Sequence, residues 1–111
     1  MEFINLTPHP VTVDSVVDGV AGTTTFPPSG GRATLVFEPT TDSSVEGFVI
    51  RPRSRVREVT GLPDPVDGIL LIVSTMVREA LPGRRDLVTP DSGPDATRAG
   101  GQVISVRRFI R

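Results

Sequence analysis

The chain has 111 residues, no cysteine, eleven proline and eleven glycine residues, and a formal net charge of −1. This length holds one domain and has no room for two, the absence of cysteine excludes disulfides and thiolate metal sites, and the near-zero charge argues against a general polyanion binder. There is no signal-peptide pattern and no apolar run of the ~18 residues that a membrane helix needs, so we expect a soluble, cytoplasmic protein with no membrane contact and no cofactor.

The first 26 residues predict a broken strand followed by a hairpin. Phe3 to Leu6 starts a strand, and Thr7-Pro8-His9-Pro10 interrupts it because neither proline can donate a hydrogen bond to a ladder. The segments Val11 to Val17 and Val20 to Phe26 flank Asp18-Gly19, a dipeptide typical of a two-residue hairpin turn. We therefore expect these two segments to pair antiparallel.

The middle of the chain predicts two further extended segments. Arg32 to Glu38 alternates apolar and polar side chains with the period of a half-buried strand. Thr40 to Ser44 is polar, and we expect it to be the least ordered loop. Val45 to Val59 predicts an extended segment with a turn at Glu46-Gly47, and Pro52 within it places its second half at a sheet edge.

The most apolar stretch is followed by the only helix signal. Ile69 to Val73 is continuously apolar between turn signals, which predicts a strand buried on both faces at the centre of a sheet. Ser74 or Thr75 supplies an N-cap oxygen, and apolar residues recur at helical spacing through Leu81 until Pro82-Gly83 stops the helix. Such a short helix has to be held by packing.

The C-terminal part predicts two strands and a hairpin turn. Asp86 to Thr89 is a short strand, and Thr89 to Pro94 is a compact, turn-rich loop. Gly100-Gly101 predicts a hairpin turn, and the alternation from Gln102 to Ile110 predicts one continuous last strand.

These elements predict an α+β fold in a single small domain over residues 1–111. We expect a mainly antiparallel, twisted β-sheet of about five to seven strands with one short α-helix. The expected core consists of Ile4, Val11, Val13, Leu35, Phe37, Val49, Ile69, Leu71, Val73, Val77, Leu81, Val88, Ile104 and Val106.

Arginines occupy every second position from Arg51 to Arg57, and on a strand they would project from one face about 6.6 to 7 Å apart. That spacing is close to the spacing of phosphates along an extended single strand. Base stacking needs interleaved aromatic residues, however, and the chain has five Phe and no Tyr or Trp, which argues against a nucleic-acid partner. The arginines are either a solvated edge that discourages aggregation or a contact surface.

His9 is the only histidine, and zinc would need carboxylates around it, so we expect no metal site. As a general base it would need a nucleophile and an orienting acid, which Ser92 and Asp91 could supply by residue type. Between two prolines, His9 is more simply a fixed turn residue that is hydrogen-bonded locally. The sequence therefore favours a protein without catalytic activity and leaves a small hydrolase-like enzyme using His9 as an alternative.

The best candidate site is composite and suits a phosphate or carboxylate group. The helix N-terminus presents free N–H groups, the loop from Asp91 to Pro94 can expose further amides, and arginines lie a few strands away. The expected ligand-binding residues are His9, Ser74, Thr75, Arg85, Asp91, Ser92, Gly93, Arg98 and Arg107, with Arg84 and Arg108 near them. The alternative is that Ser74 only caps the helix, the loop is an ordinary turn and the arginines lie on the surface.

Several motifs together resemble one family. INLTPHPV (4–11), PPSG (27–30), EVTGLP (58–63), IVSTMVREA (72–80), RRDLVTPDSGP (84–94) and QVISVRRFI (102–110) are similar to small uncharacterised proteins of actinobacteria and their phages. The resemblance spans nearly the whole chain and implies a phage or prophage setting, but no activity and no site residue. Some phage proteins of this size sequester nucleotide-derived defence signals, an analogy of size and setting only.

Three hypotheses about function follow. The first is a non-catalytic protein that binds a phosphate-bearing small molecule, such as a nucleotide or a nucleotide-derived defence signal. The second is the enzyme that uses His9. The third is a structural or interaction protein that acts as a homo-oligomer, with a dimer expected first, because a small β-rich domain leaves strand edges that another copy can cover.

Overall fold

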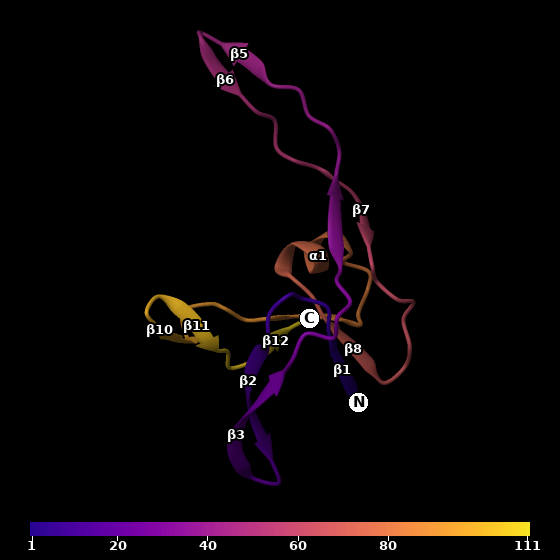
Figure 1. The fold of residues 1–111 in the computed structure, drawn as a ribbon, viewed down its shortest axis with the longest axis vertical. Helices are drawn as coiled ribbons and strands as arrows, with labels where there is room; N and C mark the ends of the chain where they lie inside the picture. Colours follow the sequence, from indigo (N-terminus) through magenta and orange to yellow (C-terminus); the bar gives the residue numbers. More distant parts are fainter.

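A small sheet lies at the centre of the molecule, and three hairpins extend from it (Figure 1). The computed structural model describes all 111 residues. The molecule measures 62 × 37 × 23 Å, and its radius of gyration of 17.3 Å exceeds the value of about 13 Å for a compact domain of this length. In chain order, the elements are β1 (Glu2–Asn5), β2 (Val11–Val17), β3 (Val20–Phe26), β4 (Thr34–Phe37), β5 (Ser43–Val45), β6 (Phe48–Ile50), β7 (Val56–Thr60), β8 (Ile69–Ile72), α1 (Thr75–Ala80), β9 (Leu87–Pro90), β10 (Thr97–Ala99), β11 (Gln102–Ser105) and β12 (Phe109–Ile110).

The central sheet is four-stranded, in the order β1-β8-β9-β12. β8 pairs in parallel with both β1 and β9, and β12 pairs antiparallel with β9. Leu71, Ile72 and Val73 are buried, as is expected for an inner strand covered on both faces. The prediction of a central strand is therefore confirmed, with the strand ending at Ile72, one residue before the predicted end.

The helix also agrees with its prediction. Ser74 is the N-cap, and its Oγ accepts a hydrogen bond from the backbone N–H of Val77 at 3.3 Å. The helix has six residues, and its side chain Val77 is buried in the main core. The structure contains no helix with the length and apolar character that crossing a bilayer requires.

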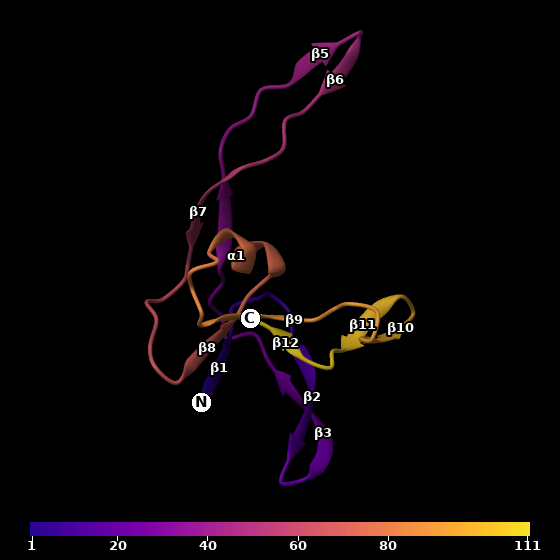
Figure 2. The same ribbon diagram turned by 180° about the vertical axis from the view of Figure 1, so that it is seen from behind.

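Two of the hairpins form around the turns that the sequence predicts. β2 and β3 pair antiparallel around Asp18-Gly19, whose φ angles are 51° and 76°. β10 and β11 pair around Gly100-Gly101, whose φ angles are also positive. Seen from behind, the β2–β3 and β10–β11 hairpins diverge from the body in different directions (Figure 2).

The expectation of one continuous strand from Gln102 to Ile110 is wrong. Val106 leaves β11 and is buried beside β2, where its N–H donates to the Thr12 carbonyl at 3.0 Å and its carbonyl accepts from the Asp14 N–H at 2.9 Å. This pairing diverts the chain, so β12 forms separately and pairs with β9. Period-two alternation cannot show such a change of partner.

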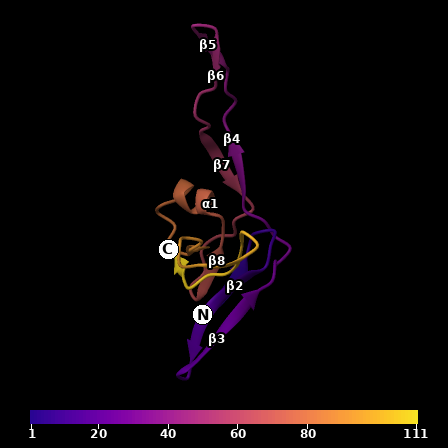
Figure 3. The same cartoon turned by 90° about the vertical axis from the view of Figure 1, so that its left-hand side faces the viewer.

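The third hairpin, residues 34–60, is the longest and is called the long arm. β4 and β7 form its base, and β5 and β6 form its tip around Glu46-Gly47. The long arm and the β2–β3 hairpin extend from opposite ends of the body (Figure 3). Ser43 and Ser44, expected in a disordered loop, belong to β5.

The predicted row of arginines on one strand face is also wrong. Residues 51–55 are not in a strand, and of the four arginines only Arg57 lies in one, β7. Pro39 and Pro52 lie in the two segments between the base and the tip of the arm, and they lack the N–H groups that a ladder needs. The arginines are nevertheless exposed in the single chain.

The fold class is confirmed as α+β, with a mostly β chain, one short helix and small, mostly antiparallel sheets. The expected sheet of about five to seven strands is not formed. The strands divide instead among one four-stranded sheet and four two-stranded ladders. Turn residues specify which neighbours form hairpins, but they do not specify whether the hairpins then join side by side.

The core consists of two clusters. The larger contains Leu6, Leu71, Val73, Val77 and Leu87 beneath α1, and the smaller contains Val13, Ala96 and Val106. The core prediction is wrong for three residues that lie exposed on the hairpins, namely Phe37, Val49 and Ile104. It also missed Leu6, Ile72, Leu87 and Ala96, which are buried.

Candidate functional site

The predicted composite site does not form as a single cluster, although its loop does bring several of its residues together. The guanidinium group of Arg98 donates to the Gly93 carbonyl at 3.1 Å and to the Ser92 carbonyl at 2.6 Å. The Gly93 N–H donates to Oδ1 of Asp91 at 3.0 Å. The amide that was expected to face a ligand is therefore taken by the loop's own carboxylate.

The other arginines near this loop also form hydrogen bonds within the protein. Arg108 donates to Asp91 Oδ2 at 2.7 Å and to Asp95 Oδ2 at 2.6 Å, and Arg107 donates to the Asp95 carbonyl at 3.2 Å. The hydrogen bond from Arg108 lowers the pKa of Asp91 below its ordinary value. An anion at this loop would have to compete with these carboxylates, so the loop is a closed structural unit.

Ser74 and Thr75 serve the helix. The Ser74 oxygen caps α1, and the Thr75 hydroxyl lies 3.4 Å from the hydroxyl of Thr89 on β9. Of the alternatives considered for Ser74, the structure shows the cap. A helix of six residues supports no anion site by itself.

His9 is exposed, and its imidazole forms no hydrogen bond with Asp91 or Ser92, so the pair that the enzyme alternative requires is not present. Its carbonyl accepts hydrogen bonds from Asn5 Nδ2 at 2.8 Å and Thr7 Oγ1 at 3.1 Å. These contacts agree with the interpretation of a turn residue fixed by its neighbours. Nowhere do three His, Asp or Glu side chains gather as metal ligands would.

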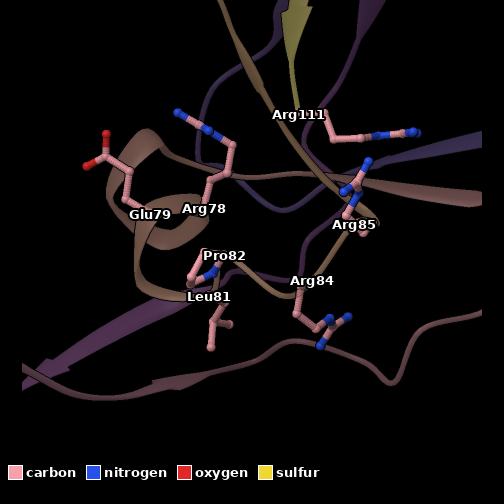
Figure 4. Close-up of a pocket in the computed structure, with 7 residues that line it drawn as sticks. All are labelled: Arg78, Glu79, Leu81, Pro82, Arg84, Arg85 and Arg111. Atoms are coloured by element: carbon pink, nitrogen blue, oxygen red, sulfur yellow. The ribbon is translucent and has the colours of Figure 1, made fainter.

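Arg85 is the predicted residue that lies in a cavity rich in arginine (Figure 4). This cavity, called the arginine pocket, has a volume of about 430 Å³. It is lined by Arg78, Glu79, Leu81, Pro82, Arg84, Arg85 and Arg111. Glu79 is its only acidic residue, so the lining is strongly cationic.

Three separate parts of the chain build the arginine pocket. Arg78 lies on α1, and the turn after the helix, in which the Arg84 N–H donates to the Leu81 carbonyl at 3.0 Å, returns the chain beside it. The antiparallel register of Ile110 with Thr89 then carries Arg111 back toward the start of β9. Sequence spacing alone could have joined Arg78 with Arg85, but the arrival of Arg111 depends on β12 pairing with β9.

The arginines of the pocket differ in what they contact. Arg84 turns away from the other three in Figure 4 and donates to Asp86 at 2.9 and 2.7 Å and to the Pro63 carbonyl at 2.9 Å. Arg78, Arg85 and Arg111 form no ion pair, since the ion pairs of the chain involve only Arg51, Arg84 and Arg108. The buried Nε of Arg78 has no hydrogen-bond partner. Three guanidinium groups are therefore available to an anion.

The Arg84–Asp86 pair predicts a dependence of stability on pH. The hydrogen bond from Arg84 lowers the pKa of Asp86 and outweighs the opposing effect of burial. The stabilisation from a carboxyl group with a lowered pKa is complete above its unfolded pKa of about 3.9 and is lost as the pH falls through its folded value. As the pH is lowered from 5 into the acid range, we expect the free energy of unfolding to fall less for Asp86→Asn than for the unmodified protein. Urea unfolding at a series of pH values is the measurement.

The exposed Asp42, which pairs with Arg51 at 3.0 Å on the long arm, provides the control. Because exposed pairs contribute little, Asp42→Asn should keep the pH profile of the unmodified protein. Identical acid profiles for Asp86→Asn and the unmodified protein would contradict the assignment.

No family model, curated protein or solved structure matches the chain. The resemblance to small actinobacterial and phage proteins therefore stays an expectation.

Proposed function

We propose that this chain is a structural or interaction protein that assembles with copies of itself through its hairpins. The observation that carries the proposal is the surface area of a single chain. It exposes 7847 Å², whereas a compact monomer of 11.9 kDa exposes about 5,950 Å². The excess of about 1,900 Å² is more than twice the roughly 800 Å² that each partner contributes to a standard interface.

Much of this surface is apolar and lies on the hairpins. Exposed large apolar side chains outnumber buried hydrophobic ones, fourteen to ten. Nine of the fourteen belong to β2–β3, to the tip of the long arm and to β10–β11: Val16, Val17, Val20, Val45, Phe48, Val49, Ile50, Val103 and Ile104. Grouped apolar surface of this kind marks contact sites.

The tip of the long arm has the least burial of any hairpin in the molecule. All six residues of β5 and β6 are exposed, and the two strands pair only with each other. An isolated two-stranded hairpin is marginally stable in water, because it buries too little surface to offset the entropy of ordering. Contact with a second copy would supply the missing burial.

The charges of the long arm favour another copy as the partner. The arm carries four arginines, Arg51, Arg53, Arg55 and Arg57, and four acids, Glu38, Asp42, Glu46 and Glu58. Of these eight residues, only Arg51 and Asp42 form an ion pair within the chain. A surface with both signs in equal number can face its own copy across a two-fold axis, where each arginine can meet an acid.

Replacement of Val49 by Asp is expected to break the assembly. Val49 is 72% exposed at the tip, and a charge there would be left without water or a counterion in an apolar interface. Light scattering at tens of micromolar should give a multiple of the chain mass for the unmodified protein and a lower mass for Val49→Asp. Circular dichroism should remain unchanged, since the residue is outside the core.

Val66→Asp is the matched control, because Val66 is a similarly exposed valine, at 57%, in the loop before β8. It should leave the mass unchanged. Arg53 and Arg55 replaced together by Glu should also lower the mass if they face a partner's acids. A monomeric mass for the unmodified protein under these conditions would remove the proposal.

A further inference from the structure

We propose that the arginine pocket binds a multiply charged phosphate group, such as pyrophosphate or the triphosphate of a nucleotide. This proposal does not rest on the assembly of the protein, because the pocket lies at α1 and the turn after it, and α1 lies away from the long-arm tip and the β2–β3 hairpin (Figure 1). It keeps the class of ligand that the sequence suggests and places it at a different site.

The lining of the arginine pocket carries an unbalanced positive charge. Arg78, Arg85 and Arg111 line one cavity without a carboxylate partner, and Glu79 can offset only one of the three charges. Like charges that share a site repel each other, and a bound anion removes that cost. Guanidinium groups present planar pairs of N–H donors that match phosphate oxygens, and this geometry favours phosphate binding.

One hydrogen-bond donor at the pocket has no partner. The Nε of Arg78 is buried without any hydrogen-bond partner. Leaving a buried donor unsatisfied is costly, so such groups are rare in folded proteins. This atom has no exposed surface, so a phosphate oxygen in the cavity would become its partner once the Arg78 side chain, which lines the cavity, turns toward the ligand.

The lining also indicates what part of the ligand is recognised. The only apolar side chains are those of Leu81 and Pro82, and no aromatic ring is present on which a base could stack. We therefore expect recognition of the phosphates and indifference to the base. A volume of about 430 Å³ has room for a di- or triphosphate.

Thermal unfolding and titration calorimetry with pyrophosphate, adenosine triphosphate, guanosine triphosphate and adenosine test the proposal. The three phosphate compounds should raise the unfolding temperature and bind with similar affinity, whereas adenosine should do neither. Added sodium chloride should weaken binding by screening. If pyrophosphate binds with the same affinity as the two nucleotides, the phosphates alone are recognised.

Arg85→Ala and Arg111→Ala should each weaken binding of pyrophosphate roughly tenfold or more, because each removes charge-assisted hydrogen bonds. Both residues are exposed, so these variants should fold normally. Arg32→Ala is the matched control, since Arg32 is an exposed arginine outside both the pocket and the long arm, and it should bind as the unmodified protein does.

Two results would each overturn the proposal. One is the absence of binding by pyrophosphate and by both triphosphates at millimolar concentration. Another is equal binding by Arg85→Ala, Arg111→Ala and the unmodified protein, which would place the ligand elsewhere.

Discussion

Asn5→Asp is expected to lower the free energy of unfolding by about 3 to 5 kcal/mol. Asn5 is 2% exposed at the end of β1. Its Nδ2 donates to the carbonyls of His9 at 2.8 Å and Phe26 at 2.9 Å, while its Oδ1 accepts from the N–H and hydroxyl of Thr7 at 2.9 and 2.6 Å. One side chain thereby joins the proline turn to the end of β3.

The substitution places an oxygen where the amide nitrogen lies. Two carbonyl oxygens would lose their donor and face a carboxylate, and the new charge would be buried without a counterion. Burial and these acceptors raise the pKa of the new carboxyl group, and a group with a raised pKa destabilises the fold as the pH rises through that value. The loss should therefore be greatest at neutral pH and smaller near pH 4, where a protonated carboxyl can donate once.

Gln102→Glu is the matched control, because it makes the same amide-to-carboxylate change at an exposed residue of β11. It should change stability by about 0.5 kcal/mol or less. Urea unfolding at one fixed protein concentration is the measurement, since assembly would make stability depend on concentration. A loss no larger than that of Gln102→Glu would contradict the role assigned to Asn5.

Leu71→Ala should cost about 2 to 5 kcal/mol. Leu71 is 1% exposed in β8 and belongs to the larger core cluster with Leu6, Val73 and Val77. Its truncation removes buried methyl groups and leaves a cavity that neighbours on an inner strand cannot easily fill.

Leu70→Ala provides the comparison on the same strand. Leu70 is adjacent in sequence but points to the opposite face of the sheet and is only partly buried. Its loss of stability should be clearly smaller. A loss below about 0.5 kcal/mol for Leu71→Ala would contradict the central position of β8.

The assembly proposal and the arginine-pocket proposal use different parts of the surface and can fail separately. Val49→Asp tests the tip of the long arm, and Arg85→Ala tests the pocket beside α1. If the unmodified protein is a monomer that binds pyrophosphate, only the first proposal falls. If it is an oligomer that binds no phosphate compound, only the second falls.

Much of the local structure could be predicted from the sequence, because it depends on neighbours in the chain. Asp18-Gly19 and Gly100-Gly101 form the expected turns, since these residues tolerate positive φ angles. Ser74 caps the helix, and the apolar run at residues 69–73 forms the inner strand, because such a run is stable only when both faces are covered. These features need no knowledge of distant contacts.

Other features depended on pairing between distant segments. Val49 and Ile104 have the β-branched character of core residues, but the hairpins that carry them leave the body and expose them. The Asp91–Gly93 loop has the composition of an anion site, yet Arg98 of β10 and Arg108, which directly precedes β12, form hydrogen bonds with it. The composition of a loop does not show which distant side chains will form hydrogen bonds with it in the folded protein.

The arginine pocket illustrates the same division. The sequence by itself determined the short helix, its stop at Pro82-Gly83 and the presence of Arg85 just beyond it. Only the tertiary structure decided that Arg84 turns to Asp86 and that β12 carries Arg111 to the site. The physical reason is that a cap or a turn is specified within a few residues, whereas the location of a side chain between elements depends on which strands pair and in which register.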